Sequence, residues 1–382
     1  MAKEELVVLQ VLPEMEHGGV EVGTVEIATG LQKAGIRNFV ASRGGRMLYE
    51  LDKIKVQHFT LPLKTKNPIQ GIVNYFSLKK IIKEHGINVV HARSRAPAWS
   101  AYFAAKKCGV KFITTFHGKY KFGPLSIKKV YNKVMTYGRL IIVISEHIKK
   151  HLINDYNVDK KKLRLVHRCV NIERFSPDSI SEERIINVIK SYNIPDDKKI
   201  LLLNGRITRW KGHTLLLDAL AKLEEKDWLC IISGSDQGRK YFVDELKEKV
   251  MELGLEDKVK FIGFCSDIPA LLSVSDVVFS TAIEPEAFGR ASIEAQAMGK
   301  IIIASNHGGS LENIVDGITG RLYENKNPDA LASAIRWAFK LTDSQKKIIA
   351  KAAQKNVEDN FSVDAMCKKT IDVYKELIKL KD

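Results

Sequence analysis

The sequence contains no long apolar run. No segment reaches the roughly 18 uninterrupted apolar residues of a transmembrane helix. Its beginning, "MAKEELVVLQVL", has too short an apolar run before Pro13 for a signal peptide, and we interpret it as a first strand. The five cysteines are far apart and form no CxxC pair, which argues against structural zinc and a disulfide framework. We therefore expect a protein of a reducing compartment, by default the cytoplasm.

Several motifs of other enzyme classes are missing as well. No GxSxG nucleophile elbow occurs, and the turn at Gly18 and Gly19 is not GxGxxG, which argues against a nicotinamide site. His147 and His151 share a helical face at metal-ligand spacing, but the glutamate precedes the first histidine and no third ligand is evident. We interpret them as a solvated helix face and expect neither a metal nor a cofactor.

Positive charge, by contrast, is in excess. The formal net charge is +16, and the excess of positive over negative charge lies in the first half of the chain, where acidic residues are few, while the second half is nearly neutral. Such unequal halves predict different partners, and the candidates are nucleic acid, an anionic membrane surface or an acidic substrate. Because no RNP motif, zinc finger or recognition helix is present, a non-catalytic nucleic-acid-binding protein is the weaker alternative, and we expect no nucleic-acid partner.

Short β-branched runs alternate with helix-length amphipathic stretches through most of the 382 residues. This alternation predicts an α/β fold of two doubly wound, Rossmann-like domains that face one another across a cleft. We expect one domain over 1–175 and another over 196–360. The polar segment 171–197 would be a hinge between them. Residues 361–382 read as a C-terminal helix, which could return to the first domain.

Two glycine-containing loops follow predicted strands. Gly18 and Gly19 precede a predicted helix that ends near Gly35, and glycines there let backbone N–H groups approach a phosphate. In the second half, Arg206 and Lys211 flank a loop between a strand and a helix. Two cations five positions apart could clamp a diphosphate, although two solvated loop charges would give the same pattern.

The stretch "TAIEPEAFGRASIEAQAMGKIIIAS" places two carboxylates around a helix start. The helix that begins near Gly289 would offer free N–H groups to a diphosphate. Carboxylates accept hydrogen bonds from hydroxyls, and a nucleotide sugar has hydroxyls on both sides of its diphosphate. We therefore expect Glu286, in the loop, to hold the sugar and Glu294, two turns into the helix, to hold the ribose.

The blocks "HGGVE", "GRITRWKG", "FIGFCSDIPALLSVSDVVFST", "EAFGRASIE" and "SNHGGSLENIVDGITG" resemble the retaining glycosyltransferases of family 4, which have the GT-B fold. The likeness follows the family's order along the whole chain. It implies that 1–175 is the acceptor- and membrane-facing domain and that 196–360 is the nucleotide-sugar-binding domain. The Glu-x7-Glu segment with its following Gly-Gly block is specific, whereas "HGGVE" is not. No Asp-x-Asp motif of the metal-dependent GT-A class occurs. By resemblance, the catalytic residues are His117 and Glu286. The residues that the resemblance implies for donor binding are Gly19, Arg206, Lys211, Phe288, Gly289, Arg290 and Glu294.

Three positions depart from the family pattern. Cys169 and Asn171 stand where the family usually has Gly and Asp, which leaves the conformation of the interdomain segment open. Arg290 occupies a position that is often Leu, and this difference could tune the choice of sugar.

The segment "VVHARSRAPAW" is similar to the lipopolysaccharide-core transferases of some Gram-negative bacteria, among which mannosyltransferases are prominent. This likeness implies transfer of a hexose, with mannose from GDP-mannose as one candidate, to a glycolipid acceptor such as a lipid A precursor. Arg93 and Arg95 would bind an acidic group of that acceptor, a Kdo carboxylate or a lipid A phosphate. Two solvated arginines beside a helix are the alternative.

A membrane-bound acceptor requires an enzyme at the membrane surface. Basic residues interleave with aromatic and aliphatic ones after His117, a mix expected of an interfacial segment. The predicted membrane contacts are Lys119, Lys121, Lys128, Lys129 and Lys133. The implied protein is thus a retaining hexosyltransferase, peripheral on the inner face of the cytoplasmic membrane. A GT-B enzyme of another class, such as a nucleotide-sugar epimerase, is a further alternative.

Overall fold

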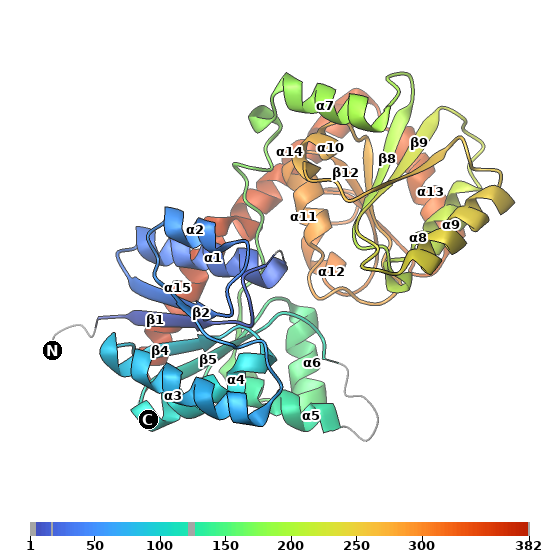
Figure 1. The fold of residues 1–382 in the computed structure, drawn as a ribbon. Helices are drawn as coiled ribbons and strands as arrows, with labels where there is room; N and C mark the ends of the chain where they lie inside the picture. The colour runs from blue at the N-terminus through green and yellow to red at the C-terminus, as the bar shows by residue number, and fades with distance from the viewer. Residues whose placement is uncertain (1–4, 17, 121–126, 381–382) are drawn as a thin grey trace. The chain divides into compact units, whose positions relative to one another are not determined.

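The computed structural model describes residues 5–16, 18–120 and 127–380. They form two compact units, the first comprising Met1–Arg168 and Val363–Asp382 and the second Cys169–Ser362. Each unit is built on a sheet whose pairings are all parallel, with helices on both faces of the sheet (Figure 1). This architecture confirms the predicted α/β fold with two Rossmann-like domains. In the described part of the chain, no helix combines the length and the apolar character that a membrane crossing needs.

The first unit has a seven-stranded sheet in the order β3-β2-β1-β4-β5-β6-β7. Its strands are β1 (Val7–Val11), β2 (Arg37–Ser42), β3 (His58–Thr60), β4 (Val89–Ala92), β5 (Lys111–Phe116), β6 (Ile141–Val143) and β7 (Leu163–Leu165). Its α-helices are α1 (Gly19–Lys33), α2 (Leu48–Lys53), α3 (Pro68–Glu84), α4 (Arg95–Cys108), α5 (Ile127–Asn132), α6 (Glu146–Tyr156) and α15 (Val363–Lys379), and short 3-10 turns are η2 (Lys133–Thr136) and η3 (Lys160–Lys162).

The second unit has a six-stranded sheet in the order β10-β9-β8-β11-β12-β13. Its strands are β8 (Lys199–Asn204), β9 (Trp228–Ser233), β10 (Val259–Gly263), β11 (Val277–Ser280), β12 (Ile301–Ser305) and β13 (Arg321–Tyr323). Its helices are η4 (Pro177–Ser179), α7 (Glu182–Tyr192), η5 (Arg209–Lys211), α8 (His213–Leu220), α9 (Lys240–Glu252), α10 (Ile268–Ser273), α11 (Arg290–Ala297), α12 (Ser310–Asn313), α13 (Pro328–Phe339) and α14 (Asp343–Phe361).

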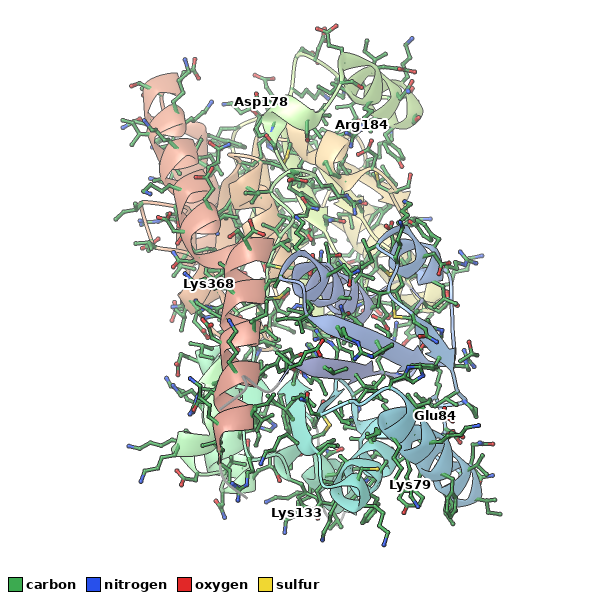
Figure 2. The ribbon with its side chains drawn as sticks, turned by 90° about the vertical axis from the view of Figure 1, so that its left-hand side faces the viewer. Lys79, Glu84, Lys133, Asp178, Arg184 and Lys368 are labelled. Carbon is green, nitrogen blue, oxygen red and sulfur yellow. The ribbon has the colours of Figure 1, made fainter. Side chains whose placement is uncertain are left out.

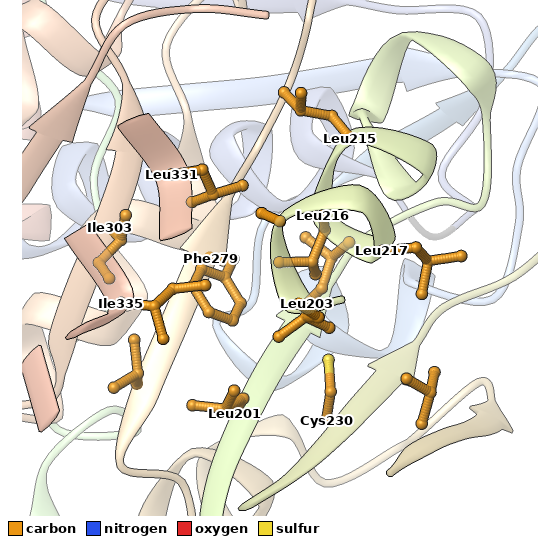
Figure 3. Packing of buried hydrophobic residues seen from close by; sticks show 14 of the residues in the cluster. Leu201, Leu203, Leu215, Leu216, Leu217, Cys230, Phe279, Ile303, Leu331 and Ile335 are labelled. Atoms are coloured by element: carbon orange, nitrogen blue, oxygen red, sulfur yellow. The ribbon is translucent and has the colours of Figure 1, made fainter. Parts of the chain in front are cut away.

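The core of the second unit lies where α8 and α13 cover the sheet. Leu203 of β8 and Phe279 of β11 are almost fully buried, and Leu216 of α8 and Ile335 of α13 pack in the same cluster (Figure 3). A strand buried on both faces reads as a continuous apolar run, and this is why "KILLLN" and "VVFS" could be recognised as strands.

The C-terminal helix α15 belongs to the first unit and packs on α1. The backbone of Ser362 is extended, and this residue caps the C-terminal end of α14, so the helix stops there before α15 begins. At Gly30 an added Cβ would lie 2.5 Å from the Sγ of Cys367, so only glycine lets α1 and α15 approach this closely. Further along α15, the hydroxyl of Tyr374 forms a 2.6 Å hydrogen bond with Nδ1 of His91 in β4. Lys368 lies on the exposed side of the same helix (Figure 2).

The expected hinge over 171–197 is in fact folded into the second unit. It contains η4 and α7, and α7 packs against α10. Arg184 of α7 holds Asp267 with its Nε and Nη2 at 2.8 and 2.7 Å. The structure therefore draws the boundary between Arg168 and Cys169, earlier than the expected domain limits of 175 and 196.

Candidate functional site

The loop after β8 brings Arg206 and Lys211 to one aromatic ring. The guanidinium carbon of Arg206 lies 5.7 Å from the centroid of Trp210, and the ammonium of Lys211 lies 4.8 Å from it. The Thr281 hydroxyl donates to the Lys211 carbonyl at 3.0 Å, which ties this loop to the end of β11. The two predicted cations are therefore neighbours at the carboxyl ends of two adjacent strands.

Gly212 makes that approach possible. Its φ is +73°, and a Cβ there would lie 1.9 Å from the Thr281 carbonyl oxygen. An L-residue would be strained in this conformation and would collide with the backbone of Thr281, directly after β11. The glycine after Lys211 therefore positions the lysine.

Lys211 and Glu286 form an ion pair, in which the Nζ of the lysine donates to Oε1 of the glutamate. The two side chains are only 16% and 11% exposed, so the pair is poorly hydrated. The other carboxylate oxygen lies 3.7 Å from where a Cβ would stand on Gly289. The Glu286 carboxylate therefore sits between the ammonium and the start of α11.

The start of α11 carries the second acidic residue. Gly289 is its N-cap with φ +87°, and Arg290 donates to Glu294 at 2.9 Å. Burial raises the pKa of Glu294, while Arg290, Arg174 and Lys211 oppose that shift. Because α11 begins at Arg290, Glu294 lies about one turn into the helix and not two, as the sequence had suggested.

The Gly-Gly block after β12 supports the loop that holds Glu286. The N–H of Gly309 donates to the Glu286 carbonyl at 2.9 Å. A Cβ on Gly308 would stand 2.7 Å from that same carbonyl oxygen, and one on Gly309 would stand 2.2 Å from the Phe288 oxygen. These glycines are therefore required for close backbone packing.

The ring of Phe288, a predicted donor-binding residue, is buried. It is 3% exposed and packs edge-on against Phe361, with the ring centroids 5.6 Å apart. Hydrophobic burial fixes the ring inside the unit, so Phe288 supports the loop from within and its side chain is not presented to a sugar.

Sequence reasoning missed three groups at this site. Trp210 has a ring that both cations approach, at 5.7 and 4.8 Å from its centroid. The side-chain amide of Asn313 donates to the carbonyls of Phe288 and Gly289. Its Oδ1 and the Ser292 hydroxyl are buried and have no hydrogen-bond partner within the residues that the structure describes. An aromatic residue between Arg206 and Lys211 was a usable signal for Trp210, whereas no spacing pointed to Asn313.

In the first unit, His117 lies beside two buried arginines. Arg93 follows β4 and His117 follows β5, and these two strands are paired in parallel, so both residues emerge at one edge of the sheet. Arg168 Nη1 donates to His117 Nδ1 at 3.1 Å, and Arg93 Nη1 donates to Gln10 at 3.1 Å. Arg93 is 4% exposed, which rejects the alternative of a solvated arginine at this position.

These contacts fix the protonation of His117. Burial lowers its pKa well below the ordinary value, and Arg93 and Arg168 lower it further. Since Arg168 donates to Nδ1, the neutral ring carries its proton on Nε2, which is buried and has no partner among the described residues. His117 is therefore suited to donate a hydrogen bond from Nε2.

The glycines of α1 let both guanidinium groups approach. Arg168 Nη2 donates to the Gly19 carbonyl, and a Cβ on Gly23 would lie 3.2 Å from Arg93 and 3.3 Å from Arg168. The expected donor-binding residue Gly19 thus shapes an arginine contact, which the sequence did not predict.

Arg95 does not join this cluster. Its Nη1 donates to Asn132 at 3.1 Å, and its guanidinium lies 4.2 Å from the centroid of Tyr120. Arg95 is the first residue of α4, whereas Arg93 directly follows β4, so the two side chains point in different directions. The side chain of Arg95 extends toward Asn132 of α5. The structure separates Arg93 from Arg95.

Only some of the predicted membrane-contact lysines lie exposed on the surface. Lys119, Lys128 and Lys133 are exposed, and Figure 2 shows Lys133 at the lower edge of the first unit. Lys129 is half-buried, with its ammonium 6.0 Å from the centroid of Tyr156, and Lys121 lies outside the described residues. The helix α5 has six residues and passes into η2, so the apolar residues divide between exposed Val130 and buried Val134.

Across residues 5–16, 18–120 and 127–380, no three histidine, cysteine or acidic side chains are grouped so that they could hold a metal ion. His151 is buried and bonds Asp155 through Nδ1, so it does not belong to the solvated face that its spacing had suggested.

Comparisons with known proteins agree with the fold. Residues 185–355 match the family model described as "Glycosyl transferases group 1", and residues 17–174 match "Glycosyltransferase Family 4". The Uncharacterized glycosyltransferase MJ1607 of Methanocaldococcus jannaschii is 30% identical over 243 residues, which are 62% of this chain and 59% of that protein.

Two solved structures cover nearly the whole chain. The Anabaena protein Alr3699/HepE in complex with UDP-glucose has a TM-score of 0.83 at 21% identity, over 97% of this chain and 100% of that one. A glycosyltransferase from Rickettsia africae is 39% identical with a TM-score of 0.91, over 99% of this chain and 100% of that one. With this likeness and both family matches, the chain belongs to the glycosyltransferases and has their two-domain GT-B fold.

Proposed function

We propose that this protein transfers a hexose from a nucleoside-diphosphate sugar to a membrane-associated glycolipid, with retention of the anomeric configuration. The observation that carries the proposal is the cluster at the start of α11, where Lys211, Glu286, Arg290 and Glu294 meet in two ion pairs. It combines cations for a diphosphate with carboxylates for hydroxyls. The Anabaena structure with UDP-glucose supports a nucleotide-sugar donor.

On the donor side, the Lys211–Glu286 pair would open when the diphosphate binds. The ammonium would then face the phosphate oxygens together with Arg206, and both would stabilise the charge that develops on the leaving diphosphate. Glu286, released from the lysine, would accept hydrogen bonds from the sugar hydroxyls. The exchange keeps every charge in this poorly hydrated site paired.

Glu294 would hold the ribose from within α11. Arg290 already holds one of its oxygens at 2.9 Å, which keeps the carboxylate in place although burial raises its pKa. Arg290 would in turn influence the choice of sugar. No metal or cofactor enters the proposed reaction, because cationic side chains and the α11 amides would serve the diphosphate.

On the acceptor side, Arg93 and Arg168 make the surroundings of His117 strongly positive. This favours an acceptor with a carboxylate or phosphate, such as a Kdo residue or a lipid A precursor. The resemblance to lipopolysaccharide-core transferases suggests mannose from GDP-mannose as the transferred unit, in lipopolysaccharide-core or related surface-glycan synthesis. Arg95 would reach such an acidic group from the side of α5. The His117 Nε2 proton would orient a hydroxyl of the sugar or the acceptor.

We place the enzyme in the cytoplasm, peripheral on the inner face of the membrane, where Lys119, Lys128 and Lys133 would face anionic lipid. Lys121 and the half-buried Lys129 complete the predicted contact.

The test is to incubate the purified protein with UDP-, GDP- and ADP-sugars and lipid A precursors, then identify products by mass spectrometry and their anomeric configuration by NMR. A product one hexose heavier, formed only with acceptor and retaining the donor's configuration, is expected. Sugar that is isomerised or released without dependence on the acceptor would overturn the proposal.

A further inference from the structure

An apolar stripe runs along the exposed side of α3. Ile69, Ile72, Val73 and Phe76 are each at least half exposed. Their spacing of three, four and seven residues places them on one face of the helix. The opposite face is buried through Leu78, Ile81 and Ile82, so α3 is apolar on two sides. A helix that only covered a sheet would need the buried side alone.

Beside this stripe lies a groove of about 880 Å³ between α3 and α4. The side chains of Ile72, Phe76, Trp99 and Phe103 line it. The rings of Trp99 and Phe103 are stacked with centroids 6.0 Å apart. The groove therefore has the size of a small-molecule site and apolar walls.

Several polar groups near the groove are already hydrogen-bonded within the protein. Trp99 donates from Nε1 to the Tyr131 carbonyl at 3.1 Å, and Ser100 donates to the Gly71 carbonyl at 3.0 Å. Asn67 caps α3 by accepting from the Ile69 N–H at 2.9 Å. The indole N–H of Trp99 and the Ser100 hydroxyl are consequently not available to a ligand, to which Trp99 offers an apolar surface.

The rim of the groove carries charge of one sign. Lys66, Lys106 and Lys107 line it and are exposed, and its lining contains no aspartate or glutamate. None of the three lysines forms an ion pair with another residue in the described part of the chain. An apolar channel with an unneutralised basic rim matches an amphiphile with an anionic head.

We propose that this groove takes an acyl chain of an anionic membrane lipid, with the lipid phosphate against the three lysines. A second copy of the chain fits the surface less well, because a symmetric contact through this face would bring two sets of three lysines together. Tyr131, which also lines the groove, stands two residues before exposed Lys133, so the lipid site continues into the basic segment. The site goes beyond the proposed sugar transfer and does not depend on it.

Trp99 provides a direct readout, because it is the tryptophan of the first unit while Trp210, Trp228 and Trp337 belong to the second. The probe is a phosphatidylglycerol vesicle whose acyl chains carry bromine, which quenches tryptophan emission on contact. We expect stronger quenching than with unbrominated vesicles, and little binding to phosphatidylcholine. The Trp99→Phe variant should still sediment with the vesicles but lose the bromine-dependent quenching.

Substitutions on the exposed stripe test the groove without disturbing the core. Ile72→Asp and Phe76→Asp should each weaken vesicle binding at least about 10-fold. Ile348→Asp is the matched control, since this α14 side chain is 67% exposed in the second unit, and it should change nothing. Replacing the three rim lysines by Gln should weaken binding about 100-fold, because each charge near an anionic leaflet contributes about 5-fold.

Three results would reject the proposal. Vesicle binding without Trp99-dependent quenching would assign the contact to the segment 119–133 alone. Failure of the wild type to bind phosphatidylglycerol would exclude a lipid. Conversion of a dimer into a monomer by Ile72→Asp would identify a second copy as the occupant. UDP and GDP binding, measured by calorimetry on the same variants, should stay unchanged, which separates this proposal from that of sugar transfer.

Discussion

The ion pair between Lys211 and Glu286 predicts that removal of the lysine destabilises the second unit in addition to weakening donor binding. Lys211→Ala leaves the Glu286 carboxylate, whose side chain is 11% exposed, without its cation. Breaking a fully buried pair in this way costs about 3–5 kcal/mol. Because both side chains keep some exposure, we expect a loss of about 1–3 kcal/mol in the free energy of unfolding.

Arg206→Ala is the matched control. Arg206 is exposed and contacts the same tryptophan ring, but it forms no ion pair with any residue that the structure describes. Its removal should change the free energy of unfolding by no more than about 0.5 kcal/mol. The double variant Lys211→Ala/Glu286→Gln, which no longer carries the unpaired charge, should recover about half of the loss.

The assay is urea denaturation followed by tryptophan emission in a Trp99→Phe background. The remaining tryptophans lie in the second unit, so the signal reports that unit alone. With a denaturant slope of about 2 kcal/mol per molar urea, the expected loss lowers the midpoint by about 0.5–1.5 M. If Lys211→Ala shifts the midpoint no more than Arg206→Ala does, the Lys211–Glu286 pair does not stabilise the second unit.

Three further predictions concern single side chains. Gly212→Ala should destabilise the second unit by at least about 1–3 kcal/mol in urea denaturation, because its Cβ would meet the Thr281 carbonyl at 1.9 Å in a left-handed conformation. The pKa of His117 is lowered in the folded state, so the unfolded chain takes up the proton first and stability falls as the pH drops below about 6.5. His117→Gln should reduce that loss when thermal unfolding is compared at pH 7.5 and 5.5. Tyr374→Phe removes the 2.6 Å contact to His91 and should lower the free energy of unfolding by about 1 kcal/mol in urea denaturation, and no change would show that this contact does not hold α15.

Much of the fold could be predicted because its central strands are buried on both faces. The runs "ELVVLQVL" and "KKILLLNG" are apolar without interruption, and the structure places β1 and β8 within them. The three-residue strands β3, β7 and β13 were not predicted. They lie at sheet edges and contain polar residues such as His58, Arg164 and Arg321, so neither length nor pattern distinguishes them from loops.

The candidate site shows what linear spacing can and cannot reveal. The strand ends indicated that Arg206, Lys211 and Glu286 gather at one edge of a sheet. The pairing of Lys211 with Glu286 joins residues 75 positions apart and depends on Gly212 and the Gly-Gly block, so no local pattern contains it. Arg168 was missed for the same reason, since it lies in the interdomain segment and reaches His117 only in the folded unit.

The groove beside α3 was hidden by an ambiguity of the sequence pattern. In "PIQGIVNYFSLKKIIKE" both helical faces carry apolar residues, and periodicity does not say which of them faces the sheet. Only the packing of Ile81 and Ile82 against the first unit leaves Ile72 and Phe76 outside.

The proposed reaction requires that the cluster at the start of α11, together with Arg206, binds a nucleoside diphosphate, and calorimetry measures this binding. UDP, GDP and ADP are titrated into the wild type and into Arg206→Ala, which should keep its fold. We predict that at least one nucleotide binds with one-to-one stoichiometry. Its affinity should fall about 10- to 150-fold in the variant, as expected for the loss of a charge-assisted contact worth about 1.5–3 kcal/mol. Binding of none of the three nucleotides, or equal affinity in the wild type and the variant, would contradict the claim.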